Sequence, residues 1–212
     1  MKKRILCFGD SNTWGAIPNT PERYGEHVRW TSVLQDTLGS NYIVIEEGYN
    51  GRTTVHDDPI EGKLSGLTYF KPCLESQLPL DLILIMLGTN DLKERFHVNP
   101  RDIADGLHRY AEVLQNAPII GSKPEILIVS PILMSLSYQE NPVLHDMFGE
   151  NAVEKSLKFA EAYKDVANDI GAHYFNAAEH AAPSSKDGLH MEPESHERLG
   201  KALALKIRQI IG

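Results

Sequence analysis

Three residues near the two ends of the chain could together carry out acyl transfer. Ser11 lies in the segment GDSN at positions 9–12, and Asp187 precedes His190 by three positions near the C-terminus. A serine hydroxyl becomes an effective nucleophile when a base accepts its proton, and an imidazole suits this task near neutral pH. The imidazole needs a carboxylate on its other nitrogen to fix its tautomer. Ser11, His190 and Asp187 are therefore candidates for nucleophile, base and orienting acid.

Acyl transfer also needs hydrogen-bond donors for the oxyanion that forms on the substrate. The backbone N–H of Ser11 is one candidate donor. Gly51 is a second, because glycine lets the backbone approach a substrate closely, although the neighbouring Asn50 could donate instead. Asn90 offers a side-chain amide that donates without being a base. It could also cap the helical segment after it, and the two roles are compatible.

Five short apolar segments alternate with segments of helical spacing, which is typical of a parallel sheet covered by helices. Several of the apolar runs are continuous, as in strands buried on both faces. We therefore predict a single domain over residues 1–212, with a three-layer α/β/α fold, about five parallel strands and right-handed crossovers. The expected strands are Arg4–Phe8, Ile43–Glu46, Leu82–Leu87, Ile126–Val129 and His173–Phe175. The expected helices are Trp30–Leu38, Asn99–Asn116, Asn151–Ile170 and Glu194–Ile211.

The candidate residues lie where strands of this predicted sheet end. Ser11 follows the first strand, Gly51 the second and Asn90 the third, while Asp187 and His190 lie between the fifth strand and the last helix. In open parallel sheets, ligands bind beyond the carboxyl ends of the strands. We therefore expect these residues to converge at one edge of the sheet.

The overall charge argues against polyanionic partners. The chain has 21 Lys and Arg against 29 Asp and Glu, a formal net charge of −8. Nucleic-acid backbones and anionic membranes attract clustered cations, so we expect neither as a partner. The N-terminal apolar run is too short for a secretory signal, and no segment approaches the ~20 apolar residues of a membrane span. We therefore expect a cytoplasmic protein.

The cysteines and histidines show no pattern of metal ligands. Cys7 lies in a predicted strand and Cys73 at the start of a predicted helix, so we interpret both as packing residues without a disulfide. None of the other histidines has the spacing of a metal motif. We therefore expect no metal site.

Three charged residues beside the candidate loops have structural interpretations. Asp10 and Asp91 adjoin loop residues whose backbone must be held in place, so we interpret them as hydrogen-bonding residues. Arg52 could bind an anionic part of a substrate. We favour a buried link between Arg52 and a neighbouring carboxylate that holds the Gly51 loop.

Two long segments, Ala16–Arg29 and Ser130–Glu150, do not fit the compact alternation and are predicted to be functional loops. The second holds nine large apolar residues, more than an exposed loop on a monomer normally carries. We therefore expect it to pack against the pocket and against a partner subunit. The predicted assembly is a homo-oligomer built on dimers, such as an octamer.

The four blocks with these candidate residues resemble those of the SGNH (GDSL-type) hydrolases, in the same order over nearly the whole chain. The segments KRILCFGDSNTWG, VIEEGYNGRTT and LDLILIMLGTND are most similar to the arylesterase/acyltransferase branch. The resemblance implies a flavodoxin-like fold, no metal or organic cofactor, and hydrolysis of short acyl esters through an acyl-enzyme. It gives Ser11, Asp187 and His190 the catalytic roles, and it gives Ser11, Gly51 and Asn90 the oxyanion hole. Relatives in that branch form closed oligomers.

A small-molecule ester is the expected substrate, with acetyl to butyryl acyl groups on aryl, alkyl or sugar alcohols. The resemblance favours Trp14 as a wall of the substrate pocket, although core packing is the alternative for this residue. The other expected pocket residues are Tyr49, Asn50, Met134 and Leu189. A narrow, apolar entrance would slow water relative to a small alcohol, so acyl transfer is expected beside hydrolysis.

Two other functions are consistent with parts of the pattern. The chain could be a catalytically silent protein that binds a small molecule in the same pocket. It could also be a metal-dependent phosphoesterase with Asp10, Asn90 and His190 as ligands, although further carboxylates and histidines would be needed.

Overall fold

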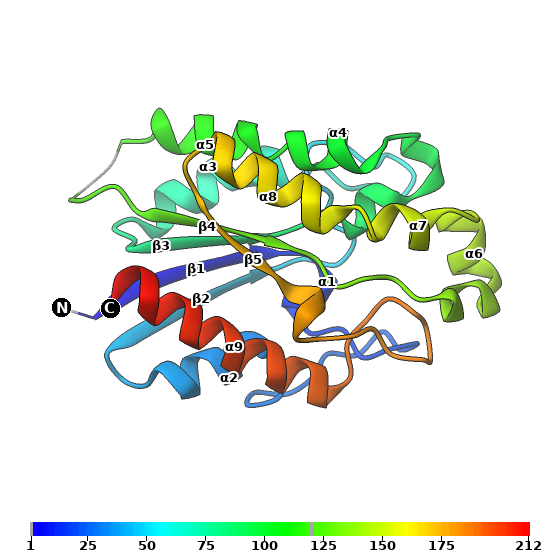
Figure 1. Ribbon diagram of the computed structural model, residues 1–212, viewed down its shortest axis with the longest axis horizontal. Coiled ribbons are helices and arrows are strands. Elements are labelled where there is room, and N and C mark those ends of the chain that lie inside the picture. The colour runs from blue at the N-terminus through cyan, green and yellow to red at the C-terminus, as the bar shows by residue number, and fades with distance from the viewer. Residues whose placement is uncertain (1, 119–120) are drawn as a thin grey trace.

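The computed structural model describes residues 2–118 and 121–212. Its five strands form one parallel sheet in the order β2-β1-β3-β4-β5. This order places the first strand inside the sheet and confirms the predicted fold class (Figure 1). The strands are β1 Lys3–Gly9, β2 Tyr42–Gly48, β3 Leu82–Met86, β4 Glu125–Ser130 and β5 His173–Asn176.

The central strands are apolar because both of their faces are covered by helices. Every residue of β3 is buried, and its alternate side chains enter two hydrophobic clusters on opposite faces of the sheet. The helices α2 and α9 cover one face, and α3, α4, α5 and α8 cover the other (Figure 1). Their bounds are α2 Trp30–Leu38, α3 Gly66–Gln77, α4 Pro100–Asp105, α5 His108–Gln115, α8 Phe159–Asp169 and α9 Pro193–Ile211.

Two segments predicted as single helices are each divided in the structure. Residues 99–116 form α4 and α5, and residues 151–170 form α7, Ala152–Ser156, and α8. At both divisions the backbone tightens into i to i+3 hydrogen bonds, such as Tyr110 N–H to the carbonyl of Leu107 at 3.1 Å. Apolar periodicity alone could not predict such a change, because it continues through the division.

The helix α3 begins earlier than the sequence indicated. Cys73, predicted at a helix start, lies in the middle of α3, which Ser65 caps through its hydroxyl. Gly66 and Pro72 are poor helix formers and hide the helical pattern. Cys73 and Cys7 are both free and buried, as expected of packing residues.

The predicted loop Ser130–Glu150 contains a 3₁₀ turn, Leu136–Glu140, and the helix α6, Pro142–Phe148. Four of its large apolar side chains are buried within this same chain, namely Ile132, Met134, Tyr138 and Phe148. Leu136 and Val143 remain exposed. Leu144 and Met147 are partly buried and pack against the core, so most of the large apolar side chains of the segment serve the core of the chain itself. Among the described residues, no helix combines the length and the apolar character needed to cross a membrane.

His196 on α9 is a buried, uncharged imidazole. Its Nδ1 accepts a hydrogen bond from the backbone N–H of Trp30 at 3.2 Å, and its ring packs edge-on against Tyr24. Burial, with smaller contributions from His190 and Arg29, lowers the pKa of His196 to about 4. The imidazole is therefore neutral in the folded protein at physiological pH.

Lowering the pH from 7 to 5 should destabilise the wild-type protein more than the variant His196→Asn. The unfolded chain protonates this imidazole near its ordinary pKa of about 6.5, whereas the folded chain keeps it neutral down to about 4. Between these values the unfolded state binds more protons, so stability falls as pH falls. The extra loss is about 2 kcal/mol, measured by urea unfolding at both pH values. His97→Asn, at an exposed position, should behave as wild type. Equal pH dependence in all three proteins would contradict the assignment.

Candidate active site

Ser11, His190 and Asp187 form one chain of hydrogen bonds at the carboxyl edge of the sheet. Nε2 of His190 lies 3.0 Å from Oγ of Ser11, and Nδ1 of His190 lies 2.7 Å from Oδ2 of Asp187. This is the arrangement in which the carboxylate fixes the tautomer, so that Nε2 is free to accept the serine proton. The predicted nucleophile, base and acid are thus within direct reach of one another.

The carboxylate of Asp187 is held by its own turn. Its Oδ1 accepts the backbone N–H of Leu189 at 3.0 Å and of His190 at 2.9 Å, and Oδ2 also accepts the N–H of Asn19 at 3.3 Å. Burial acts to raise the pKa of Asp187, but the contacts with His190 and the N–H of Leu189 outweigh it and hold the pKa below its ordinary value. Asp187 is therefore ionised while His190 exchanges a proton with Ser11.

Ser11 is the first residue of the short helix α1, Ser11–Trp14. Asp10 caps this helix, since its carboxylate accepts the N–H of Asn12 at 3.0 Å. The N–H of Ser11 lies in the first turn, where a helix has no internal acceptor for it, so it is available as an oxyanion donor. Burial raises the pKa of Asp10 to about 6, against the opposing effects of Asn12, His190 and Arg52.

Asn12 joins the segment of Ser11 to the turn that carries His190, a role that the sequence did not indicate. Its Nδ2 donates to the carbonyl of Leu189 at 3.2 Å, and its Oδ1 accepts the N–H of Met191 at 3.1 Å. These two residues flank His190, so one buried amide fixes the turn on both sides of the imidazole. The adjacency of Asn12 to Ser11 was the only signal in the sequence.

The segment after β4 also supports the catalytic turn. Gly188 has φ of 65°, and a Cβ on it would collide with the carbonyl of Ser135 and lie 2.6 Å from the nitrogen of Tyr138. The N–H of Ser135 donates to the carbonyl of Gly188 at 3.0 Å. The loop predicted to line the pocket thus packs directly on the turn that carries His190.

Gly51 lies under a small hairpin closed by buried charges. Its φ is +77°, and a Cβ would collide with Nζ of Lys63 and lie 2.7 Å from Oε2 of Glu61. Lys93, which is 1% exposed, holds the hairpin through ion pairs to Asp58 at 3.2 Å and to Glu61 at 2.5 Å. The positive φ favours glycine at position 51, and the hairpin holds the loop that carries this candidate oxyanion donor. The neighbouring Asn50 is exposed.

Asn90 faces the same loop from the end of β3. Its Nδ2 donates to the backbone carbonyl of Arg52 at 3.1 Å, which leaves the second hydrogen of the amide for a substrate. The next residue, Asp91, is fully buried and accepts the N–H of Thr54 at 2.9 Å and Nδ1 of His56 at 3.0 Å. Asp91 therefore holds the loop after Gly51, in agreement with its structural interpretation.

Replacing Asn90 with alanine should lower kcat by roughly 10²–10³, the usual loss for one oxyanion donor. KM should change much less, because the amide acts on charge that develops in the transition state. Steady-state kinetics with p-nitrophenyl acetate measures both constants. Asn116→Ala, at an exposed position, is the control. A loss below threefold would remove Asn90 from the oxyanion hole.

Arg52 is buried, but its partners differ from the prediction. Its Nη1 donates to the carbonyl of Gly9 at 2.9 Å and to the carbonyl of Glu47, rather than to a carboxylate. Its guanidinium also lies 4.2 Å from the centre of the Phe8 ring. Arg52 thus links the Gly51 loop to the strand ends through backbone oxygens, which the residue types along the chain could not reveal.

The expected pocket residues have different surroundings. Trp14 is half-buried, with the guanidinium of Arg23 at 5.3 Å from the centre of its ring. Met134 and Leu189 are nearly fully buried in the hydrophobic cluster on the α3 side of the sheet. Tyr49 is 50% exposed and lines a cavity behind the Gly51 loop.

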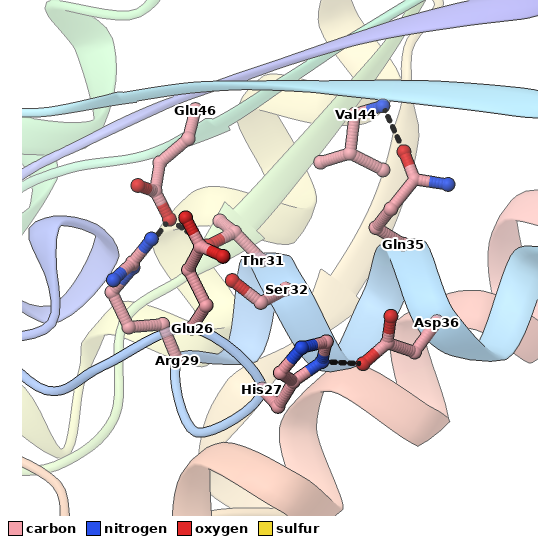
Figure 2. A pocket seen from close by; sticks show the side chains of 9 residues that line it. All are labelled: Glu26, His27, Arg29, Thr31, Ser32, Gln35, Asp36, Val44 and Glu46. Atoms are coloured by element: carbon pink, nitrogen blue, oxygen red, sulfur yellow. Dashed lines mark hydrogen bonds and ion pairs between the residues drawn. The ribbon is translucent and has the colours of Figure 1, made fainter.

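A second hollow, of about 260 Å³, lies beside β2 and α2 and is lined by none of these residues. Figure 2 shows two charged pairs among its side chains. Arg29 donates to Glu46 at 3.1 Å, and His27 lies 2.7 Å from Asp36. This hollow is therefore no part of the catalytic arrangement.

The geometry distinguishes acyl transfer from a metal-dependent phosphoesterase. Both ring nitrogens of His190 are engaged by Ser11 and Asp187, and Asp10 is engaged as a helix cap. The three residues that would be ligands in the alternative therefore each have another role. Within residues 2–118 and 121–212, no cluster of three or more His, Cys, Asp or Glu could hold a metal ion.

Several solved structures that this chain resembles are esterases. The native M. smegmatis aryl esterase is 38% identical, with a TM-score of 0.93 over 98% of this chain and 99% of that one. A carbohydrate acetylesterase from Sinorhizobium meliloti is 39% identical, with a TM-score of 0.92 over the same shares. A comparison with curated protein sequences found no match. The model of the GDSL-like lipase/acylhydrolase family matches residues 7–198. That match includes Ser11, Gly51, Asn90 and His190, and the chain belongs to this family and is a carboxylic ester hydrolase.

Proposed function

We propose that the protein cleaves short-chain carboxylic esters through an acyl-enzyme on Ser11. The observation that carries this proposal is the continuous hydrogen-bonded chain from Oγ of Ser11 through His190 to the buried carboxylate of Asp187. Ser11 contacts the base that must accept its proton, and this base contacts the carboxylate that must orient it, as nucleophilic catalysis requires.

In the first half-reaction, Oγ of Ser11 attacks the ester carbonyl carbon and its proton passes to Nε2 of His190. The carbonyl oxygen becomes an oxyanion, which the N–H groups of Ser11 and of the Gly51 loop and the amide of Asn90 stabilise. The carbon–oxygen bond to the alcohol then breaks, and His190 returns the proton to the leaving alcohol. In the second half-reaction a water, or a second alcohol, repeats these steps on the acyl-enzyme and releases Ser11.

The proposed substrates carry acetyl to butyryl groups on aryl, alkyl or sugar alcohols. The similarity to an aryl esterase and to a carbohydrate acetylesterase supports both kinds of alcohol. The short acyl limit is supported by dense packing near the turn of His190, where Met134 and Leu189 are almost fully buried. An added methylene that fits gains about 0.8 kcal/mol, whereas one that does not fit must displace packed side chains.

The test is a panel of p-nitrophenyl esters from acetyl to octanoyl, assayed with and without added small alcohols. Activity should rise little to butyryl and then fall steeply, and part of the acyl group should pass to the alcohol. Preference for octanoyl would overturn the short-chain limit. Absence of transfer at every alcohol concentration would overturn the acyltransferase part while leaving the hydrolysis intact.

We further propose that the enzyme works as a homo-oligomer built on dimers, in the cytoplasm. Exposed Leu136 and Val143 on the segment after β4 support a subunit contact there. Light scattering should give a mass well above the 23.7 kDa of one chain, and a mass equal to one chain would reject the proposal. Cell fractionation tests the compartment.

A further inference from the structure

A cavity of about 550 Å³ lies behind the oxyanion loop, between the end of β2, the hairpin over Gly51 and the first turns of α3. Its volume is within the range of pockets that bind small molecules. Its lining is largely aromatic and polar and includes Glu47, Tyr49, Arg52, Lys63, Thr68 and Tyr69.

The buried guanidinium of Arg52 has donors that the described part of the chain does not use. Arg52 is 5% exposed, and its two hydrogen bonds to backbone carbonyls both come from Nη1. Nε and Nη2 accordingly have no partner among the described residues, and Arg52 lines the cavity. Neither nitrogen is among the buried, unpartnered polar atoms of the described residues, so both can be reached by solvent or by a ligand in the cavity. The cavity is therefore equipped for a ligand with hydroxyl or other oxygen acceptors.

Two tyrosine rings flank these donors. The ring centres of Tyr49 and Tyr69 lie 5.6 Å and 5.4 Å from the Arg52 guanidinium, and the side chains are 50% and 44% exposed. Exposed rings beside polar groups are typical of surfaces that bind one apolar face and one polar edge of a ligand together. The C–H face of a sugar ring and its hydroxyl edge meet both requirements.

The charges of the cavity nearly balance, which favours a neutral ligand over an anion. Arg52 is opposed by Glu47, whose carboxylate accepts the hydroxyl of Tyr69 at 3.3 Å. Lys63 is paired with Glu61 at 2.9 Å. The cavity thus offers both donors and acceptors, as hydroxyl groups require, and an anion would meet the repulsion of Glu47.

We propose that this cavity binds a pyranose ring, with its face against Tyr49 and Tyr69 and its hydroxyl groups on Arg52 and Glu47. The site lies behind the oxyanion loop and is connected to it by Arg52, whose carbonyl accepts the amide of Asn90. This proposal rests on the proposed esterase function. The bound ring would be a sugar of an acetylated carbohydrate substrate that does not itself react.

The test titrates the Ser11→Ala protein with methyl β-D-glucopyranoside, followed by two-dimensional NMR of backbone amides. Without the nucleophile no turnover occurs, so sugar binding is measured independently of esterase activity. We expect saturable binding in the millimolar range, with the largest shifts at Tyr49, Arg52, Lys63 and Tyr69. Adding Thr68→Trp, which fills the cavity, should weaken binding at least about tenfold, whereas Lys71→Trp, at an exposed position on the same helix, should not.

Tyr69→Ala is a second variant, which keeps the test valid if the added tryptophan unfolds the protein. It should weaken binding about fivefold to tenfold, because an aromatic contact is lost. A parallel titration with sodium sulfate distinguishes an anion site. Three results would each overturn the proposal: binding of sulfate without binding of the glucoside, shifts confined to the turn of His190, or equal glucoside affinity in Thr68→Trp and Lys71→Trp. Loss of p-nitrophenyl acetate cleavage by the wild type, with sugar binding intact, would instead overturn only the proposed function.

Discussion

Replacing Ser11 with alanine should abolish ester cleavage and leave the fold unchanged. The change removes the only atom that can form the acyl-enzyme, and the lost Oγ has one hydrogen-bond partner among the described residues, Nε2 of His190. The helix α1 keeps its cap, because Asp10 binds the backbone of Asn12 and not the serine hydroxyl. Catalysis from the oxyanion donors alone should remain many orders of magnitude below wild type.

Two measurements check this expectation. Hydrolysis of p-nitrophenyl acetate should be undetectable above background, and a fluorophosphonate probe should label the wild type but not Ser11→Ala. Ser40→Ala, at an exposed position, should be labelled normally, and thermal unfolding should be alike for all three proteins. Wild-type-like cleavage by purified Ser11→Ala would falsify the proposed mechanism. A wild-type protein that resists the probe would favour the silent binding protein.

Asp187→Asn should lower kcat about 10⁴-fold, the second largest effect expected. Nδ1 of His190 now donates to Oδ2 of Asp187 at 2.7 Å. An amide at this position would present its N–H₂ to Nδ1, because the amide oxygen remains drawn to the N–H groups of Leu189 and His190. The proton of the imidazole would then sit on Nε2, which could no longer accept the proton of Ser11.

A loss of stability should accompany this change at neutral pH. The folded state holds the pKa of Asp187 below its ordinary value, so the ionised group stabilises the protein above that ordinary value and stops doing so as pH falls through the folded pKa. Asparagine lacks this contribution at every pH. Stopped-flow or steady-state kinetics gives kcat, and urea unfolding gives the stability. Asp146→Asn, at an exposed position, is the control. A decrease of less than tenfold in kcat would mean that another carboxylate orients His190.

The sequence by itself determined the fold class and the chemistry at the strand ends. A strand that is buried on both faces needs a continuous apolar run, so such runs indicate the strands of a covered parallel sheet. The strands β1 to β5 lie within two residues of their predicted bounds. Ser11, Asn90 and the Asp187–His190 pair could be found because each lies in a short loop after a strand or before a helix. A parallel sheet brings such loops to one edge whatever the details of packing.

The links between these loops were decided only by the tertiary structure. Asn12 contacts Leu189 across 177 positions of the chain. The carbonyl of Arg52 accepts the amide of Asn90, and the guanidinium of Arg52 donates to the carbonyl of Gly9. Backbone carbonyls carry no sequence signature. The buried ion pairs over Gly51 and the packing of Ser135 on Gly188 belong to the same class. Periodicity and turn chemistry act over a few neighbouring residues, whereas these contacts depend on how separate elements pack together. The residues that meet at the candidate active site could therefore be predicted from the sequence, and the groups that hold them in place could not.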